Sequence, residues 1–276
     1  MGSLDGKVAF ISGGARGQGR SHAVGLAAEG ASIITFDVCD QIPSVGYPAA
    51  TEDDLASTVK EVEAVGGKIV ALKADVRAQA AVQAVLDEGV LAFGRVDIVI
   101  ANAGIMPIVG EQSKTRQAWH DAIDINLTGV LHTCEAAIPR LLDQGQGGSI
   151  IIISSTAGLK GPMRQLDMKR DGYLGYIASK HAVIGLMRSY ANVLGPYSIR
   201  CNTIHPTGVF SPMVANAEFG QLAQEQPALL ESMHNVLPIP FVEMQDVTNA
   251  VLYLASDTGR FVTGLEMRVD AGAMSY

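Results

Sequence analysis

The chain has 276 residues and a mass of 29.0 kDa, with 48% hydrophobic and 17% charged residues and a mean hydropathy of +0.23. A composition this apolar argues against disorder and predicts a globular, soluble protein with one continuous core. The formal net charge is −8 and lysines and arginines form no run, which argues against a nucleic-acid partner.

Cysteines, histidines and apolar runs indicate the compartment and the absence of a metal site. Cys39, Cys134 and Cys201 form no CxxC pair, which is typical of a reducing cytosol. The six histidines show no HExxH or paired spacing, so we predict no metal. The start, MGSLDGKVAF, lacks an export signal, and the longest apolar runs are far shorter than the ~18 residues that span a bilayer. We therefore expect a cytoplasmic protein without a membrane contact.

Short apolar runs rich in valine and isoleucine recur along the chain, separated by stretches with helical periodicity. Runs that are apolar on both faces are typical of buried parallel strands covered by helices. We therefore predict one α/β domain over residues 1–276, with a doubly wound, Rossmann-type parallel sheet of about seven strands and helices on both faces. The runs are 8–12, 32–37, 69–72, 98–101, 150–154, 200–204 and 266–269.

Two stretches break this rhythm and are predicted to be loops. Residues 39–52 follow the second predicted strand, and residues 161–175 follow the fifth. Both come after carboxyl ends of strands, which form the ligand-binding edge of an open α/β sheet. We expect functional loops, with plain surface insertions as the alternative.

A glycine-rich turn follows the first predicted strand. Residues 12–19 read Ser-Gly-Gly-Ala-Arg-Gly-Gln-Gly and lead into a helix predicted to begin near Gln18. Backbone N–H groups and the positive end of a helix meet in such a turn, which suits a pyrophosphate. Ordinary strand-to-helix turns can share this glycine spacing, but its place between a strand and a helix favours phosphate binding.

Asp37 ends the second predicted strand, where a carboxylate can accept hydrogen bonds from the ribose hydroxyls of an adenosine. A 2′-phosphate at that position would face a like charge, so Asp37 favours NAD over NADP. Arg16 is the opposing signal, because a guanidinium in the glycine turn could bind that phosphate. An arginine can swing into water, whereas like-charge repulsion is hard to evade, and we therefore predict NAD.

Tyr176 and Lys180 lie four residues apart at the head of a predicted helix, which places a phenol beside an ammonium. A neighbouring ammonium lowers the pKa of a phenol, so Tyr176 is a candidate acid and base for a carbinol or carbonyl oxygen. An isolated YxxxK pair is more often a surface pair on an amphipathic helix. The preceding Ser154 and Ser155, at the end of a buried strand, favour the catalytic interpretation.

In this order, the motifs resemble those of short-chain dehydrogenases/reductases, in the short single-domain branch, over essentially the whole chain. Gly13, Gly17 and Gly19 fit the glycine motif of that family, with Ser12 in place of the usual threonine. Together with the features above, the resemblance implies a set of cofactor-binding residues. They are Gly13, Arg16, Gly17, Gln18, Gly19, Asp37, Val38, Asp75, Val76, Asn102, Ala103, Gly104, Tyr176, Lys180, Pro206, Val209 and Ser211.

The resemblance also implies a catalytic tetrad of Asn126, Ser155, Tyr176 and Lys180. In that family the asparagine organises a water that relays protons, and the lysine also bonds the ribose of the cofactor. Ser155 takes the serine position because it directly precedes a small-small-glycine segment, with Ser154 as the alternative. Tyr176 takes the tyrosine position because Tyr173 has no lysine four residues on; Tyr173 is expected to line the pocket.

Other segments match the family motifs around the cofactor. The resemblance implies that Asp75 bonds the adenine amino group and that the segment 102–104 lines the cofactor and braces the fourth strand. It implies that the backbone of Val209 holds the nicotinamide carboxamide, supported by the hydroxyl of Ser211. Thr207 departs from the pattern, because a glycine usually follows the proline there.

The two predicted loops, the segment Gly-Gln-Gly-Arg-Ser-His at 17–22 and the segment His-Pro-Thr-Gly at 205–208 resemble the mycofactocin-associated branch. Its members include carveol-dehydrogenase-like proteins. That narrower resemblance implies NAD held so tightly that an external redox carrier, similar to mycofactocin, reoxidises it in place. The two loops would cover both ends of the dinucleotide.

We therefore predict an NAD-dependent secondary-alcohol dehydrogenase acting on a small apolar, possibly terpenoid, alcohol or the corresponding ketone. The alternatives are an ordinary dehydrogenase with freely exchanging NAD and a non-catalytic cofactor-binding protein. The resemblance also implies a homotetramer that pairs helices near 128–142 and 176–194, with Ala178, Ala182 and Gly185 suited to close approach. The predicted apolar pocket wall comprises Ile105, Met106, Leu159, Met163, Tyr173, Phe210 and Met213, and Arg164 is a possible anion-binding residue.

Overall fold

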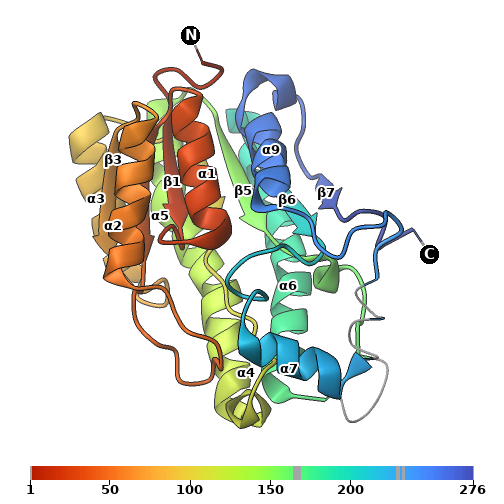
Figure 1. Cartoon of the computed structure of the whole chain (residues 1–276). Coiled ribbons are helices and arrows are strands. Elements are labelled where there is room, and N and C mark those ends of the chain that lie inside the picture. Colours follow the sequence, from red (N-terminus) through yellow and green to blue (C-terminus); the bar gives the residue numbers. More distant parts are fainter. Residues whose placement is uncertain (1, 164–168, 228–230, 232–233, 276) are drawn as a thin grey trace.

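A seven-stranded parallel sheet forms the centre of the computed structural model, in the order β3-β2-β1-β4-β5-β6-β7 (Figure 1). The structure describes residues 2–163, 169–227, 231 and 234–275. All seven predicted strands are found, which confirms the predicted fold. The strands are β1 (Val8–Ser12), β2 (Ser32–Asp37), β3 (Ile69–Lys73), β4 (Ile98–Ala101), β5 (Gly148–Ile153), β6 (Ile199–Pro206) and β7 (Glu266–Val269).

Helices cover both faces of the sheet. One hydrophobic core lies between the sheet and α1, α2 and α9, and the other lies between the sheet and α3, α5 and α6. Successive side chains of β1 point to opposite faces of the sheet, so Phe10 packs into one core and Ile11 into the other. The helices are α1 (Gly17–Ala28), α2 (Glu52–Ala64), α3 (Gln79–Phe93), α4 (Arg116–Ile123), α5 (Gly129–Gln144), α6 (Asp171–Leu194), α7 (Ala217–Glu225) and α9 (Met244–Ala255).

The sheet has its switch point at β1. This strand pairs with β2 on one side and with β4 on the other. Strands β2 and β3 therefore lie on one side of it, and β4 to β7 lie on the other. At such a point the loops after neighbouring strands diverge and leave a crevice at the carboxyl ends of the strands. The predicted ligand-binding edge is therefore this end of the sheet.

Residues 38–51, which follow β2, form a packed segment that we call the strap. Ile42, Val45 and Tyr47 are buried, although the segment has no helix or strand. The side-chain amide of Gln41 donates to the carbonyl oxygens of Ile42 at 3.2 Å and Val45 at 2.9 Å, which folds the strap on itself. The capping box of Thr51 then starts α2.

The second predicted loop is shorter than expected. Helix α6 begins at Asp171, so residues 171–175 are helical and Tyr176 lies in the second turn of the helix. The loop prediction is wrong there because α4 and α6 pack extensively against each other and extend the helix. Residues 164–168, including Arg164, lie outside the described residues. Among the helices of the described part, we find none with the length and apolar character of a membrane span.

Candidate active site

The glycine turn between β1 and α1 forms the floor of a cleft. Gly13 and Gly17 have φ values of 74° and 59°, in the left-handed region. A Cβ on Gly13 would lie 2.8 Å from the Cα of Ala103, and one on Gly19 would lie 2.0 Å from the carbonyl oxygen of Gly13. Only glycines allow this close packing of strand, turn and helix.

Helix α1 starts with its first amides available to a ligand. Its N-cap residue, Arg16, makes no side-chain cap hydrogen bond, and its first turn has no acidic residue. By contrast, Thr51 caps α2 and Thr115 caps α4 through their side chains. The positive end of α1 therefore suits the anionic pyrophosphate of a dinucleotide.

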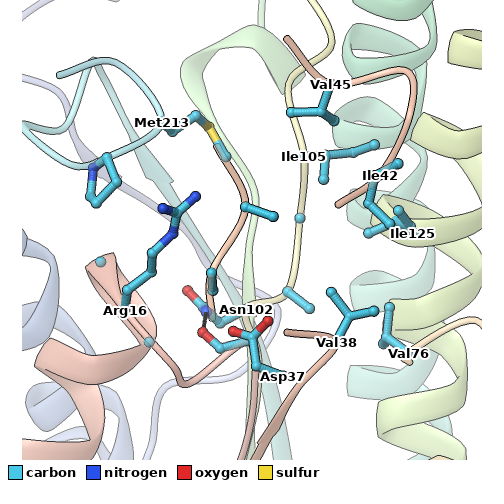
Figure 2. Close-up of a pocket in the computed structure, with 18 of the residues that line it drawn as sticks. Arg16, Asp37, Val38, Ile42, Val45, Val76, Asn102, Ile105, Ile125 and Met213 are labelled. Atoms are coloured by element: carbon cyan, nitrogen blue, oxygen red, sulfur yellow. Dashed lines mark hydrogen bonds between the residues drawn. The ribbon is translucent and has the colours of Figure 1, made fainter. Parts of the chain in front are cut away.

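Asp37 and Arg16 both line this cleft (Figure 2). The Asp37 carboxylate accepts a hydrogen bond from the N–H of Ala15 at 3.1 Å. Burial raises the pKa of Asp37, while backbone hydrogen bonds and the charge of Arg16 oppose that rise. The Arg16 guanidinium points away from the carboxylate and donates to the carbonyl oxygen of Pro48 in the strap at 2.5 Å. Arg16 is thus engaged by the strap, while Asp37 faces the space for an adenosine ribose.

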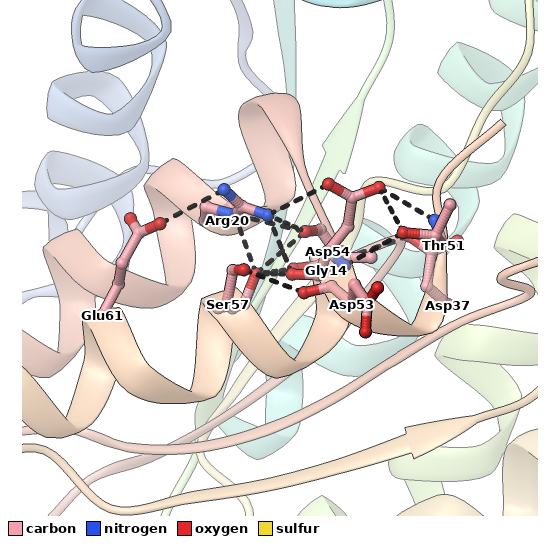
Figure 3. A network of polar contacts seen from close by, with 10 residues as sticks. Gly14, Arg20, Asp37, Thr51, Asp53, Asp54, Ser57 and Glu61 are labelled. Atoms are coloured by element: carbon pink, nitrogen blue, oxygen red, sulfur yellow. Dashed lines mark hydrogen bonds and ion pairs between the residues drawn. The ribbon is translucent and has the colours of Figure 1, made fainter. Parts of the chain in front are cut away.

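A polar network fixes the glycine turn against α2 (Figure 3). The Arg20 guanidinium donates to the carbonyl oxygen of Ala15 at 2.7 Å and pairs with Glu61 at 3.2 Å. The Thr58 hydroxyl lies 2.9 Å from the carbonyl oxygen of Gly14. These contacts bond the carbonyl oxygens of Gly14 and Ala15, while the N–H groups of Gly13 and Gly14 donate to the carbonyl oxygen of Phe36.

The Asn-Ala-Gly segment after β4 braces the same turn, as the resemblance implied. The Asn102 side-chain amide donates to the carbonyl oxygens of Ser12 at 3.0 Å and Gly13 at 3.1 Å. In return, the Ser12 hydroxyl accepts hydrogen bonds from the N–H groups of Asn102 and Ala103. Serine in place of threonine therefore keeps the hydroxyl that joins β1 to β4.

Asp75 lies at the adenine end of the cleft, with Val38 and Val76 beside it. Its carboxylate pairs with the Arg77 guanidinium at 2.6 Å. Burial works against ionisation of Asp75, but the hydrogen bonds from Arg77 outweigh it and hold the pKa of Asp75 below its usual value. A charged, oriented acceptor at this place fits an adenine amino group, and the contact itself stays a prediction.

Tyr176 and Lys180 lie on one face of α6, with the ammonium 5.8 Å from the centroid of the phenol ring. Both side chains are buried and line a second cavity together with Ser155. The Tyr173 ring stacks on Tyr176 with 6.1 Å between centroids, and it lines that cavity as predicted. The helix thus presents phenol, ammonium and an aromatic wall to one space.

The structure distinguishes the two adjacent serines. Ser154 is buried, and its hydroxyl donates to the carbonyl oxygen of Lys180 at 2.9 Å, so it ties β5 to α6. Both serines line the cavity, but it is the Ser155 hydroxyl, which accepts from the N–H of Ala157 at 3.1 Å, that lowers the pKa of Tyr176 against the effect of burial. This placement favours Ser155 as the residue that contacts a substrate oxygen.

The pKa of Tyr176 differs from the expectation. Burial raises it, and the hydrogen bond with Ser155 opposes that rise. Burial also lowers the pKa of Lys180 to about 8, while its ammonium donates to the carbonyl oxygen of Ile153 at 2.7 Å. The predicted lowering of the Tyr176 pKa by Lys180 is therefore wrong for the chain alone, because desolvation disfavours the charged form of both groups.

Asn126 lies behind the cavity wall. It is fully buried in a π-helical turn, η2 (Asp124–Thr128), between α4 and α5. Its carboxamide accepts from the N–H of Ile105 at 2.8 Å and donates to the carbonyl oxygen of Ile105 at 2.8 Å. Asn126 therefore fixes the backbone after β4, and the proton-relay water implied by the resemblance stays a prediction.

The segment after β6 is the one that the resemblance assigns to the nicotinamide. Val209 forms a bridge with Val242 in which Gly208 and Phe210 supply the hydrogen-bonding groups, so the N–H and C=O of Val209 face the other way. Val209 and Ser211 line the catalytic cavity, as expected for groups that hold a carboxamide. Thr207 needs no left-handed backbone, and its hydroxyl donates to Asn235 at 2.9 Å. A glycine is therefore unnecessary there.

The nucleotide cavity, about 1000 Å³, and the catalytic cavity, about 850 Å³, are adjacent, and both volumes include space open to solvent. Gln18, Asn102, Gly104, Ser211 and Met213 line both of them. Every predicted cofactor-binding residue lines one or both cavities.

Gln18 carries the clearest mark of a missing ligand at the junction of the two cavities. Within the described residues, its buried Oε1 atom has no hydrogen-bond partner. A buried acceptor of this kind fits a donor group on a bound molecule. Together with the free amides of α1 and the Asp37 carboxylate, it supports a dinucleotide such as NAD.

The predicted pocket wall is correct in part. Met106, Tyr173 and Met213 line the catalytic cavity, and Ile105 lines the nucleotide cavity. Phe210 was wrongly included: it is 50% exposed and packs on Phe241, because side chains alternate and its neighbour Val209 faces inward. Leu159 and Met163 pack against the core and line neither cavity.

Sequence reasoning missed several lining residues. Ile42, Val45 and Tyr47 of the strap line the nucleotide cavity, and Lys160 lines the catalytic cavity. The signal for the strap was present in its composition, because three large apolar residues close together are unusual in a solvated loop. No local sequence pattern pointed to Lys160, because its position depends on tertiary contacts, such as its hydrogen bond to the carbonyl oxygen of Ala273.

Residues 13–274 match the family model described as Enoyl-(Acyl carrier protein) reductase. The chain is 44% identical over 282 residues to (-)-trans-carveol dehydrogenase of Rhodococcus erythropolis, covering 99% of each chain. The solved structure of carveol dehydrogenase from Mycobacterium avium in complex with NAD superposes with a TM-score of 0.91 at 44% identity, covering 100% of both chains. That of a short chain dehydrogenase from Mycobacterium paratuberculosis bound to NAD gives 0.90 at 44% identity, again over 100% of both chains. The similarity spans the nucleotide cleft and the catalytic cavity alike, and the chain belongs to the short-chain dehydrogenase/reductase family.

Proposed function

We propose that the chain is an NAD-dependent short-chain alcohol dehydrogenase. One observation carries this proposal: Ser155, Tyr176 and Lys180 line one cavity, which lies beside the nucleotide cavity and shares five lining residues with it. A non-catalytic cofactor-binding protein would have no use for a phenol and an ammonium buried together, because burying ionisable groups costs free energy. Relatives with bound NAD support the choice of cofactor.

Bound NAD supplies the acceptor for the hydride that leaves the carbinol carbon. Tyr176 takes the hydroxyl proton of the alcohol, and Ser155 hydrogen-bonds the same oxygen. Because burial raises the pKa of Tyr176, its deprotonated form needs a nearby positive charge. With a pKa of about 8, Lys180 remains mostly protonated at neutral pH and supplies that charge.

The substrate is a small apolar secondary alcohol, possibly a terpenoid, or its ketone. Met106, Tyr173, Met213 and Val214 give the catalytic cavity apolar walls. Two cationic side chains line the cavity, and both donate to main-chain carbonyl oxygens: Lys160 to Ala273 at 3.2 Å and Lys180 to Ile153 at 2.7 Å. A relative that acts on carveol fits this class of substrate.

A matched panel of alcohols tests the substrate class. Carveol isomers, cyclohexanol and lactate are each incubated with the protein, NAD and an artificial electron acceptor, and the carbonyl products are quantified by chromatography. Carveol and cyclohexanol should be oxidised with kcat/KM at least about 100-fold above that of lactate, since a carboxylate would lose solvation in a cavity whose lysines already bond main-chain carbonyl oxygens. A preference for lactate would contradict the apolar assignment.

NAD is held tightly, and an external redox carrier similar to mycofactocin reoxidises it in place. The strap supports this, because it lines the nucleotide cavity and Arg16 of the glycine turn donates to the carbonyl oxygen of Pro48 in the strap at 2.5 Å. A strap that must open first slows release of a covered ligand. The alternative is free exchange of NAD, with the strap serving only as a wall.

Cofactor content separates these two alternatives. Protein purified without added NAD is denatured, the released NAD is quantified, and turnover is measured with either free NAD or an artificial electron acceptor. Near-stoichiometric NAD with turnover only through the acceptor supports tight retention. Cofactor-free protein that turns over with added NAD would leave the dehydrogenase assignment in place and remove the redox carrier.

The protein assembles as a cytoplasmic homotetramer that pairs α5 and α6 between subunits. Ala182 and Gly185 are exposed on α6, and a Cβ on Gly185 would meet no atom within 4 Å, so a partner helix can approach closely. Light scattering should give the mass of four chains. A monomer at micromolar concentration would contradict this assembly.

A further inference from the structure

The strap reaches from the nucleotide cavity to the catalytic cavity through one side chain, Tyr47. This residue is only 5% exposed, and its ring lines the nucleotide cavity. Its phenol oxygen accepts a hydrogen bond from the backbone N–H of Met106 at 3.1 Å. Met106 in turn lines the catalytic cavity. A residue of the strap thus contacts the main chain that forms the catalytic wall.

The segment 104–106 is the wall between the two cavities. Gly104 lines both, Ile105 lines the nucleotide side and Met106 lines the catalytic side. Asn126 holds both backbone polar groups of Ile105, and Tyr47 holds the next backbone N–H. Three consecutive hydrogen-bonding groups of this wall are therefore fixed by two side chains from distant parts of the sequence.

Resting on the alcohol dehydrogenation proposed above, we infer that Tyr47 is a positioning residue for that reaction. It acts through Met106, whose placement sets the wall opposite Tyr176 and the position of the alcohol. A displacement of about 1 Å in an active site can lower the rate about 100-fold. The hydrogen bonds that fix the backbone of residues 104–106 should therefore affect turnover.

The strap has other anchors, which makes the contribution of Tyr47 separable. The Ser44 hydroxyl donates to the buried Asp121 carboxylate at 2.6 Å, and Arg16 donates to the carbonyl oxygen of Pro48. Neither contact involves residues 104–106. Tyr47→Phe keeps the buried ring and these anchors, and it removes only the oxygen that accepts from Met106.

Tyr47 has no part in proton transfer, since its phenol oxygen is bonded to the N–H of Met106 and the residue lines the nucleotide cavity, whereas Tyr176 lines the catalytic one. Tyr47→Phe should therefore lower kcat at every pH without moving the apparent pKa values of the profile. A residue that exchanged protons with the alcohol would shift one limb of that profile.

The test compares Tyr47→Phe with Ser44→Ala in the full-length protein. Tyr47→Phe should lower kcat for carveol by roughly tenfold, with KM changed by less than about twofold and NAD content unchanged. Hydrogen-exchange mass spectrometry should show faster exchange in peptides containing Met106. Ser44→Ala should keep kcat and Met106 exchange near wild type, because it loosens only the anchor to α4.

Unchanged kcat together with unchanged exchange at Met106 in Tyr47→Phe would overturn the inference. An equal loss of kcat in Ser44→Ala would also overturn it, because strap docking in general would then be responsible. If the wild-type protein oxidised no alcohol, the proposed function would fail, while hydrogen exchange would still show whether Tyr47 fixes the wall.

Discussion

The nucleotide half and the catalytic half of the cleft are built by different means. In the nucleotide half, the uncapped start of α1 lies at the cleft, and glycines at φ values of 74° and 59° shape the turn that leads into it. In the catalytic half, side chains from α6 and from the end of β5 converge, with a buried phenol and ammonium. The first half depends on local conformation and the second on tertiary packing.

This difference has an energetic counterpart. In the nucleotide half, backbone hydrogen bonds and the charge of Arg16 compensate the burial of the Asp37 carboxylate, although burial still raises its pKa. Lys180 and Tyr176 instead lose solvation, which lowers the pKa of the lysine to about 8 and raises that of the tyrosine. Changes in the two halves should therefore separate chemistry from cofactor binding.

The largest expected effect comes from removing the acid and base of the catalytic half. Tyr176→Phe should lower kcat for carveol by about 10³-fold, since a positioned acid or base contributes 10²- to 10⁴-fold. The nucleotide half should be unaffected, with NAD content equal to that of the wild type. Wild-type turnover in this variant would contradict the assigned chemistry, and loss of NAD would contradict the separation of the two halves.

Within the catalytic half, the adjacent serines should differ. Ser155→Ala removes a hydroxyl beside Tyr176 and should lower kcat by about 100-fold. Ser154→Ala removes a buried bond from β5 to α6 and should cost about 1 kcal/mol in the free energy of unfolding with little change in kcat. Steady-state assays and chemical denaturation of both variants measure the two effects. The reverse pattern would make Ser154 the substrate-contacting serine.

A substitution in the nucleotide half should change the preference for NAD over NADP and leave the catalytic half unaffected. Asp37→Ser removes the carboxylate that would face a 2′-phosphate, and it should weaken NAD binding by about 10- to 100-fold while strengthening NADP binding. The kcat at saturating NAD should stay close to wild type. Calorimetric titration of cofactor-free protein provides the affinities, with Arg16→Ala as the control. Tighter binding of NADP than NAD by the wild type would show that Arg16 dominates.

The last effect concerns stability rather than turnover, and it comes from a buried imidazole on α1 that lines neither cavity. Burial lowers the pKa of His22 to about 3, and its Nδ1 lies 2.8 Å from the Thr248 hydroxyl on α9. The unfolded chain binds a proton near pH 6.5, so stability is complete above that pH and falls toward pH 3. The loss is up to about 1.4 kcal/mol per pH unit.

His22→Gln should remove this part of the acid sensitivity, because it keeps a polar group for Thr248 and has no proton to gain. Thermal unfolding between pH 3 and 7 measures the difference from the wild type. An equal loss of stability in both proteins would show that the carboxylates alone set the acid limit. Lys180, whose charge is needed for turnover, admits no comparable replacement.

The sequence predicted most of the fold because its signals are local. Each strand is an apolar run of valine and isoleucine, and a parallel sheet buries such runs on both faces, so all seven were found. The start of α6 at Asp171 was missed, because packing against α4 extends the helix beyond its own local signals. The glycine turn and Asp37 were identified from their places between strand and helix.

Tertiary structure decided what depends on solvation and on distant contacts. It reversed the expected direction of the Tyr176 pKa, since the phenol and the ammonium are both removed from water. It turned Phe210 outward, and it distinguished Ser155 from Ser154 by the hydrogen bond that ties Ser154 to α6. It also places the Tyr47 phenol in hydrogen-bond contact with the backbone of Met106, 59 residues away in sequence. A sequence specifies local conformation through nearby residues, whereas burial and long-range hydrogen bonds exist only once the chain has folded.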